Sequence, residues 1–413
     1  MNALGMAMRN VFRYRRRSLI TAAAIGFGVM FTIAIDGMLA GTERESARNI
    51  RDYETGDIKV YPPEYFDDRA VSQFTSFIER DDRKRLEAIL GDRRWTPRVN
   101  AQAELDFGEE WFAVPGSVQA TLTAVDPVRD GDTLAVARMV DSGRWLRKGD
   151  TGIVIGSWLA DDIGAKPGYW LTVECKGRGG FYQTFDAEIL GTVTTENPVV
   201  NRNGAFIALD AADELLALEG GVTEYVIRSR KGDGASAEAK ELSLAAGGLP
   251  VDVRTWEEIA HDEILLTKAK SSGSKLYLFF MFIIAAVGIS NTMLMAVMER
   301  RHEIGMLRSL GYPTIRIRGM FVVEGFCIGL LGAAMGLVGG IALDVFMIVK
   351  GIDFSFMLRE MDVGYRITGV MRSAWNLPGI VSAVVGSLVI STFVAWFPSG
   401  KMLRKEVAEI LRS

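Results

Sequence analysis

Two histidines and three pairs of adjacent aspartates are the residues whose types could support metal binding or acid–base catalysis. The two histidines are His261 and His302, and a run of 23 uncharged residues, 276–298, separates them. If this run crosses a membrane, the imidazoles lie on opposite sides and cannot share a metal site or a proton relay. A cation site also needs several converging oxygen ligands, so we interpret the acidic pairs as solvated charge: Asp67-Asp68, Asp81-Asp82 and Asp161-Asp162. The sequence therefore predicts no catalytic residues and no metal site.

Two glycine-containing segments were candidates for phosphate binding. The sequence contains no G-x-x-x-x-G-K-[ST] segment, the pattern in which backbone N–H groups and a lysine hold nucleotide phosphates. Residues 271–277, SSGSKLY, resemble it only superficially, and residues 177–181, GRGGF, are typical of a hairpin turn. No cofactor is expected in this chain, and any ATP and Mg²⁺ must bind to another polypeptide.

Four apolar runs dominate the rest of the sequence: Thr21–Ala40, Leu276–Met298, Met320–Val349 and Gly379–Phe397. A helix rises ~1.5 Å per residue and a bilayer core is ~30 Å thick, so each run is long enough to cross a membrane. Buried helices of a soluble protein are the alternative, but runs this long without a polar face do not suit one. The sequence predicts four transmembrane helices, with a long polar segment between the first and the second.

Basic residues near the ends of these runs predict the orientation, because cytoplasmic flanks are rich in Lys and Arg. Such residues precede the first run, fill the connector between the second and third, and follow the fourth: Arg9, Arg13, Arg15, Arg16, Arg17, Arg300, Arg301, Arg308, Arg316, Arg318, Lys401, Arg404, Lys405 and Arg412. Both termini are therefore expected in the cytoplasm, and residues 41–275 and 350–378 outside. A cleavable signal peptide is the alternative for the first run, but this run is too long for a usual signal-peptide core.

The outer segment is predicted to be a mixed α/β domain. Alternating apolar residues indicate strands at 57–61, 120–125, 151–156, 169–175, 185–193 and 224–230, and helical patterns occur at 81–90, 211–218 and 235–246. We expect three regions: 1–45, an amphipathic entry helix and the first span; 46–270, an outer domain of two lobes; and 271–413, a membrane domain with three spans. The fold class is thus an α+β membrane protein.

Charge and cysteine content exclude little but agree with this division. The net charge of −4 combines basic cytoplasmic flanks with a more acidic outer segment, and nothing in it indicates nucleic-acid binding. Cys175 lies in the outer segment and Cys327 in the third apolar run. The topology keeps them apart, so no disulfide within the chain is expected.

The connector and its flanks carry a specific family signature. The run MAVMERRHEIGMLRSLGYPTIRIRGMFVVEG resembles the permease core of FtsX-like ABC transporter subunits, in which E-R-x-x-E-I-G-x-L-R-A-L-G precedes a turn and a new helix. The matching positions are Glu299, Arg300, Glu303, Ile304, Gly305, Leu307, Arg308, Leu310, Gly311 and Glu324, whereas Ser309 stands where alanine is usual. The beginning and the end of the chain are similar to the same family.

The outer segment resembles the MacB-like periplasmic core of larger family members. Residues 141–173, DSGRWLRKGDTGIVIGSWLADDIGAKPGYWLTV, look like a passage of the lipoprotein-releasing LolC and LolE type, although Tyr169 replaces a commonly acidic residue. This resemblance implies a bacterial inner-membrane permease that works with an ABC ATPase dimer, a second permease chain and membrane lipids. The implied task is ATP-driven extraction of lipoproteins or other amphiphiles, with a periplasmic shuttle or adaptor as a further candidate partner. MacB-like efflux and FtsX-like regulation of a cell-wall hydrolase remain alternatives.

The connector also has the physical properties of a docking helix. Residues 299–310 should form a short helix that Gly311 and Pro313 end. Ile304, Leu307 and Leu310 share one stripe that could dock into a groove of an ATPase. The alternative is an interfacial helix that lies on lipid headgroups.

Inside the spans, polar and small residues suggest further roles. Glu324 could pair with Arg308 or Arg318 and so link the connector to the third span, and Asp36 and Asp344 could reach water at the outer end. Gly332, Gly336 and Gly340 form a flat face, which we interpret as packing within the subunit. In the family, the first and second spans meet their counterparts in the other permease. This arrangement implies a cargo cavity lined by Phe31, Ile35, Met38, Leu39, Phe279 and Ile283.

Overall fold

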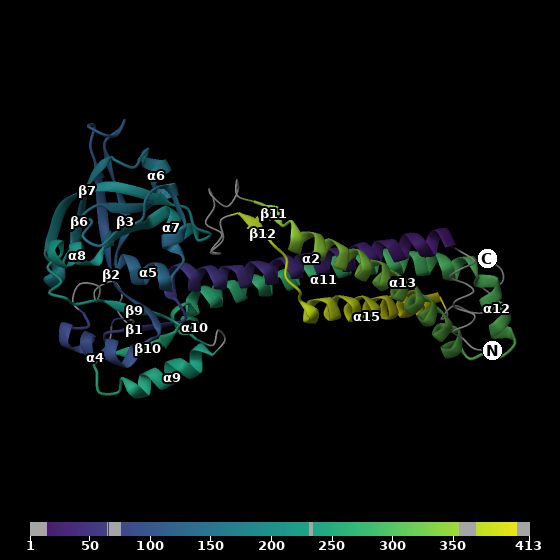
Figure 1. Cartoon of the computed structure of the whole chain (residues 1–413). Helices are drawn as coiled ribbons and strands as arrows, with labels where there is room; N and C mark the ends of the chain where they lie inside the picture. The colour runs from purple at the N-terminus through teal and green to yellow at the C-terminus, as the bar shows by residue number, and fades with distance from the viewer. Residues whose placement is uncertain (1–14, 64, 66–75, 231–233, 355–368, 403–413) are drawn as a thin grey trace. The chain divides into compact units, whose positions relative to one another are not determined.

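The computed structural model describes residues 15–63, 65, 76–230, 234–354 and 369–402, and these residues form two compact units. Of the described residues, an outer unit comprises those within 45–266 and residue 369, and a membrane unit comprises 15–44, 267–354 and 370–402. Figure 1 labels most of the strands of the outer unit and the long helices of the membrane unit. Each unit is described by itself below.

The outer unit is built on one mixed sheet of ten strands. Their order is β10-β1-β9-β2-β3-β8-β5-β7-β4, and β6 pairs with β2 and β7. Pairing is antiparallel except for β3 with β8 and β5 with β7. The strands are β1 (Ile58–Tyr61), β2 (Arg94–Phe107), β3 (Gly116–Val125), β4 (Val140–Gly143), β5 (Ile153–Gly156), β6 (Trp170–Lys176), β7 (Tyr182–Val193), β8 (Gly204–Ala208), β9 (Glu224–Arg228) and β10 (Asp252–Thr255).

Short helices cover this sheet and complete its core. They are η1 (Arg51–Thr55, a π-helix), α4 (Arg80–Leu90), α5 (Pro127–Thr133), η2 (Val136–Arg138), α6 (Ser157–Ile163), η3 (Arg178–Gly180), α7 (Pro198–Asn203), α8 (Leu209–Leu215), α9 (Ala235–Ala245) and α10 (Trp256–Ile259). The largest apolar cluster joins strand residues such as Ile58, Leu122 and Ile155 with Leu86 of α4 and Leu242 of α9. A core of this size fits a domain of about 200 residues that folds around its own sheet.

Most of the predicted elements of the outer domain are confirmed. All six predicted strands and all three predicted helices are present, with ends that differ from the prediction by at most four residues. The GRGGF segment joins β6 to β7 in an antiparallel hairpin in which Lys176 pairs with Tyr182, as its glycines indicated. Cys175 and Cys327 are free thiols, and burial raises the pKa of Cys175 to about 11.

Long helices form the membrane unit: α2 (Arg15–Ile50), α11 (His261–Glu299), α13 (Thr314–Val349) and α15 (Leu377–Met402), with the shorter α12 (Arg301–Ser309) between α11 and α13. Two of them begin or end in the outer unit. A small hairpin of β11 (Ile352–Asp353) and β12 (Val370–Met371) lies between α13 and α15 in the chain. Among the described residues, three helical segments are long and apolar enough to cross a membrane: 18–55, 314–349 and 377–396. In α11 the described apolar part is the shorter segment 286–299, so four spans remain a prediction.

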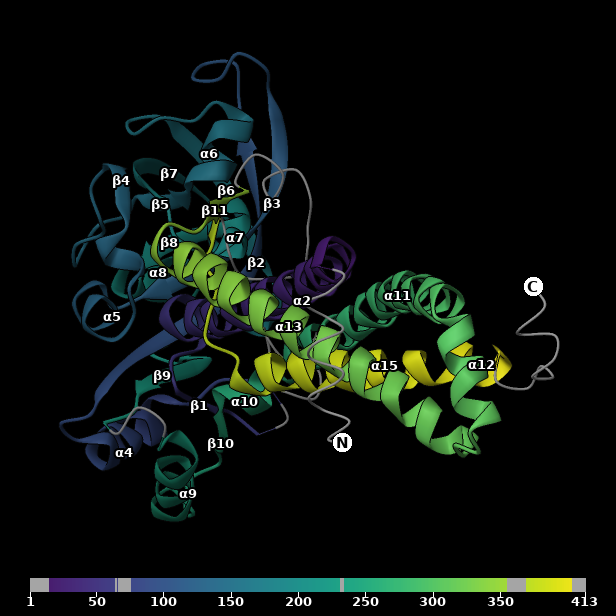
Figure 2. The same cartoon turned by 90° about the vertical axis from the view of Figure 1, so that its right-hand side faces the viewer.

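The predicted glycine face of the third apolar run packs within the chain. Gly332, Gly336 and Gly340 of α13 lie against α2, and an added Cβ at Gly336 would come 2.5 Å from the carbonyl oxygen of Gly26. On another side of α13, Gly325 and Gly329 lie against α15. Figure 2 shows the helices of this unit from a second direction. Small residues let the helix backbones approach closely, which is the main source of helix association in lipid.

Candidate functional site at the connector between α11 and α13

The connector consists of one short helix between two sharp changes of direction. α11 ends at Glu299, Arg300 leaves the helical conformation, and α12 runs from Arg301 to Ser309. At its other end, Gly311 adopts φ +80°, a conformation that suits glycine, and its N–H donates to the carbonyl of Arg308 at 3.0 Å. Pro313 then precedes the first residue of α13. The predicted short helix is thus present, but it begins two residues later than expected.

The inner face of α12 packs on its own chain. Ile304 is 3% exposed and joins a cluster with Val297 of α11 and with Ile317 and Phe321 of α13, and Leu307 packs beside it. The prediction that Ile304, Leu307 and Leu310 form one docking stripe is therefore wrong for Ile304. This side chain positions α12 against the membrane helices instead.

Met306 of α12 and Leu310, directly after this helix, form an exposed apolar pair. Met306 is 59% exposed and Leu310 is 78% exposed. They are four residues apart, so they lie on one face, and His302 and Glu303 are exposed one turn earlier. The sequence interpretation missed Met306 because it assigned the docking face to the stripe of Ile304, Leu307 and Leu310. Its spacing from Leu310 was the available signal.

A buried ion pair connects the start of the connector to α13. The Arg300 guanidinium lies 3.3 Å from the Glu324 carboxylate, and both side chains are nearly inaccessible to solvent. The sequence indicated Arg308 or Arg318 as partners of Glu324. Arg318 instead donates to the carbonyl oxygen of Trp396 at 2.9 Å and stacks on the Trp396 ring, so it connects α13 with α15. The connector thus contacts α13, the helix of the third apolar run, through both an ion pair and an apolar cluster.

Comparison with known proteins shows which family the chain belongs to. A family model described as MacB-like periplasmic core domain matches residues 18–243, more than half of the chain, and one described as FtsX-like permease C-terminal matches residues 275–407. The chain belongs to the FtsX/MacB-like family of ABC transporter permeases. The resemblance found in the connector and in the outer segment is therefore confirmed.

Relatives of this permease cover most of its length at low identity. An uncharacterized ABC transporter permease of Methanocaldococcus jannaschii is 23% identical over 98% of this chain and 96% of its own. The lipoprotein-releasing system transmembrane protein LolC of Xylella fastidiosa is 24% identical over 76% of this chain and 78% of its own. The macrolide export ATP-binding/permease protein MacB 2 of Aeromonas hydrophila is 21% identical over 94% of this chain, which spans 58% of that protein.

The residues predicted to line a cargo cavity lie on α2 and α11 of the permease. Phe31, Phe279 and Ile283 are exposed, and Ile35, Met38 and Leu39 are half-buried. Phe31 also stacks on Phe27, with ring centroids 6.2 Å apart. Exposed aromatic side chains on helices of this kind are available to lipid or to another protein chain. Their role in a cavity between two permeases stays a prediction.

The two aspartates in the apolar runs occupy different environments. Asp344 of α13 is 1% exposed, and its carboxylate accepts a hydrogen bond from the Ser373 hydroxyl. The expectation that it reaches water is therefore wrong. Asp36 of α2 is half-buried. Gly37 lies directly against Asp344 and Ser373, and a side chain at this position would collide with both.

Proposed function

We propose that this permease is the membrane subunit of an ATP-driven transporter of the mechanotransmission type that extracts lipoproteins or other amphiphiles from the outer leaflet of a bacterial inner membrane. In this proposal the chain has four spans, with α11 as the second, and both termini are cytoplasmic. ATP and Mg²⁺ bind to a separate dimer of ATP-binding subunits. A second permease chain, identical or related, completes the membrane part.

The architecture of α12 is the observation that carries this proposal. Its inner face is fixed by Ile304 and by the Arg300–Glu324 pair, whereas Met306 and Leu310 are exposed. A helix anchored on one side and apolar on the other suits a partner with a complementary groove. When ATP closes the partner dimer, movement of α12 would pass to α11 and α13 through these anchors. That movement would then reach the outer unit through the helices that continue into it.

The cargo assignment rests on the relatives and on the share of each relative's length that the chain spans. A relative named as part of a lipoprotein-releasing system and another named for macrolide export both align with most of the chain. We favour lipoprotein release because the chain spans 78% of the LolC relative but 58% of the MacB relative. Efflux from the periplasm is the second candidate, and regulation of a cell-wall hydrolase is the third.

Affinity purification of the full chain from its native membrane, followed by mass spectrometry, tests the partners and the cargo. We expect an ABC ATPase together with acylated polypeptides. An ATPase with a periplasmic adaptor and no acylated polypeptide would favour efflux, and a cell-wall hydrolase in its place would favour regulation. Purification without any ATPase would contradict the central proposal.

A pair of matched variants tests the docking face of α12. Leu310 and Leu244 are both leucines with 78% exposure, but Leu244 lies on α9 of the outer unit. We expect Leu310→Asp to reduce the copurified ATPase at least tenfold, because a carboxylate would have to enter an apolar groove. Leu244→Asp should retain the ATPase. Equal retention in both variants would contradict docking through this face.

A further inference from the structure

The outer unit contains a cavity of about 290 Å³ whose lining combines charged and amide side chains with aromatic and aliphatic ones. Five strands, β1, β9, β2, β3 and β8, form its floor, and η1, α7 and the end of α10 contribute walls. All of its lining residues belong to the outer unit. The cavity is therefore a property of this domain by itself.

The polar floor results from the alternation of side chains along the strands. Residues two apart in a strand face the same side, so Lys59 shares a face with Tyr61, and Arg98 shares a face with Asn100. The opposite face of β1 and β2 carries Ile58, Val60 and Val99, which are buried in the main core. One side of the sheet is thus an ordinary apolar core, and the other side collects charged and amide side chains around the cavity.

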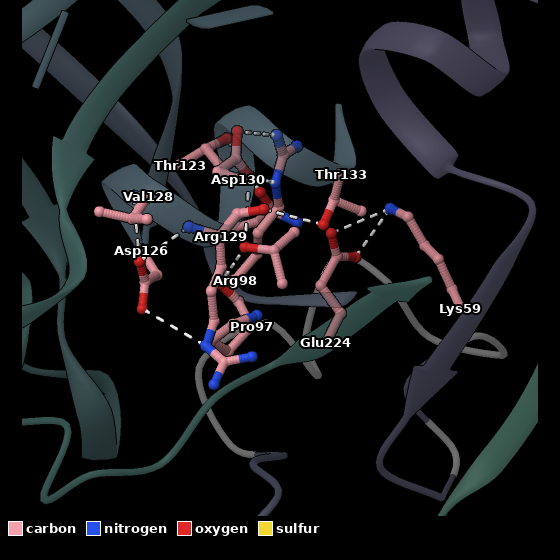
Figure 3. A network of polar contacts seen from close by, with 12 residues as sticks. Lys59, Pro97, Arg98, Thr123, Asp126, Val128, Arg129, Asp130, Thr133 and Glu224 are labelled. Carbon is pink, nitrogen blue, oxygen red and sulfur yellow. Dashed lines mark hydrogen bonds and ion pairs between the residues drawn. The ribbon is translucent and has the colours of Figure 1, made fainter. Parts of the chain in front are cut away.

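Two buried ion pairs organise this floor (Figure 3). The Lys59 ammonium donates to both oxygens of Glu224 at 2.9 Å. Beside it, the Arg98 guanidinium binds both oxygens of Asp130, at 2.7 Å through Nε and 3.0 Å through Nη2. Each pair neutralises itself, and the two-point contact fixes the plane of the guanidinium.

After these contacts, hydrogen-bond donors remain unused at the cavity. Among the described residues, the Arg98 Nη1 group has no hydrogen-bond partner, because its other two nitrogens hold Asp130. The Asn100 carbonyl accepts from the Thr123 hydroxyl at 2.9 Å, which leaves the Asn100 amide NH₂ group available. The third proton of Lys59 is also left over. These groups offer donors to an acceptor group of a ligand. The Glu54 carboxylate also lines the cavity and accepts a hydrogen bond from the Asn197 amide.

Another part of the cavity lining is suited to an apolar body. Tyr61 and Tyr65 are stacked with ring centroids 5.1 Å apart, and Ile259 packs with them. Val199 and Phe206 continue this wall. The π-helix η1 also lines the cavity, and such irregular turns are frequent at functional sites.

A purely structural role for the ion pairs does not explain the space beside them. Protein interiors are closely packed, and voids larger than one water are few. At about 290 Å³, this cavity is far larger than the space that one water needs. If the ion pairs served only to stabilise the sheet, we would expect other side chains to fill the space beside them. An open space that combines unused donors with stacked rings is typical of a small-molecule site.

We propose that this cavity binds a small monocarboxylate with an aromatic or aliphatic body. The carboxylate accepts hydrogen bonds from Arg98 Nη1 and the Asn100 amide, and the body packs on Tyr61 and Tyr65. This binding site goes beyond the transport function proposed above and does not depend on it.

Binding of 3-phenylpropionate to the full chain in lipid nanodiscs, measured by calorimetry, tests the proposal. The uncharged control ligand is 3-phenylpropanol, and we expect it to bind at least tenfold more weakly. Asn100→Asp places a negative charge beside the ligand carboxylate with almost no change in volume and should weaken binding at least tenfold. The matched control is Gln102→Glu, which makes the same chemical change two residues along β2, at an exposed position outside the cavity. It should retain affinity within twofold.

A second variant keeps the test decisive if Asn100→Asp does not fold. Asn203 lines the cavity but is exposed, so Asn203→Trp should be tolerated and should fill part of the entrance. We expect at least a fivefold loss of affinity. The proposal is overturned if the wild-type chain does not bind 3-phenylpropionate at millimolar concentration or binds the alcohol equally well. It is also overturned if the folded cavity variants bind like the wild type. The measurement needs no ATPase, so its failure is separate from failure of the transport proposal.

Discussion

The outer unit and the membrane unit are stabilised by different kinds of contact. In the outer unit, a ten-stranded sheet joins an apolar core to charged pairs that are almost fully buried, Lys59 with Glu224 and Arg98 with Asp130. In the membrane unit, glycines of α13 bring helix backbones together, with Gly336 against α2. Water drives burial of the core in the first unit, whereas lipid gives apolar helices little reason to associate except close packing.

This difference shows where each unit is most sensitive to substitution. A buried charge in the outer unit depends on its partner, because a lone charge away from water is very unfavourable. A glycine at a helix contact depends on the absence of a side chain. The Arg300–Glu324 pair extends the first principle to the membrane unit, because it is a buried charge pair at the connector.

The largest effect is expected when one partner of a buried pair in the outer unit is removed. Lys59→Met leaves the Glu224 carboxylate without its ammonium, and loss of one partner of such a pair costs about 3–5 kcal/mol. We expect a clear drop in the melting temperature of the outer unit. Tryptophan fluorescence during heating measures this temperature. The double variant Lys59→Met/Glu224→Leu should recover most of this loss, because it leaves no unpaired charge. A single variant as stable as the wild type would contradict the distinction between the units.

A glycine contact of the membrane unit should give the next largest effect. Gly336→Ala adds a Cβ within 2.5 Å of the Gly26 carbonyl oxygen, and overpacking of this kind typically costs about 1–3 kcal/mol. The measurement is unfolding of the detergent-solubilised chain. The control is Gly28→Ala on α2, where an added Cβ meets no atom within 4 Å. It should be neutral or stabilising, because alanine favours helix by about 1 kcal/mol over glycine.

The features that sequence predicted well depend on local periodicity. Each of these features depends on residues that are close together in the sequence. They are the apolar runs, the alternating strands, the glycine spacing of α13 and the GRGGF hairpin. β2 was missed because it departs from simple alternation. Its first half is buried on both faces, Arg98 and Asn100 line the cavity, and Pro97 is unusual within a strand.

The parts that sequence could not predict depend on the partners of each face. A stripe on α12 can face either its own chain or solvent, and the structure buries Ile304 and exposes Met306. The same limit applies to the cavity of the outer unit. Lys59, Arg98 and Glu224 are far apart in the chain and meet only because β1, β9 and β2 are neighbours in the sheet.

The connector pair should affect activity more than stability. Glu324→Gln keeps the shape of the side chain but removes the charge that holds Arg300. We expect about a tenfold decrease in ATP hydrolysis and transport by the assembled complex, equivalent to about 1.4 kcal/mol. If the pair acts as a unit, Arg300→Gln/Glu324→Gln should lose no more than either single variant. Unchanged ATP hydrolysis and transport in Glu324→Gln would show that the pair does not transmit movement.

The smallest effect is expected from a charged pair at the surface of the outer unit. Arg144 donates two hydrogen bonds to Asp150, and these lower the pKa of the Asp150 carboxyl below its usual value of 3.8. A lowered pKa stabilises the fold above about pH 4, and this contribution disappears as pH falls through the lowered pKa. Because the pair is partly exposed, Asp150→Asn should cost less than about 1 kcal/mol at pH 7. Melting temperatures of variant and wild type should converge as pH falls from 7 to 2, whereas Asp132→Asn, at an exposed carboxylate, should match the wild type throughout. A cost as large as that of Lys59→Met would mean that burial is not what separates strong from weak charge pairs in this unit.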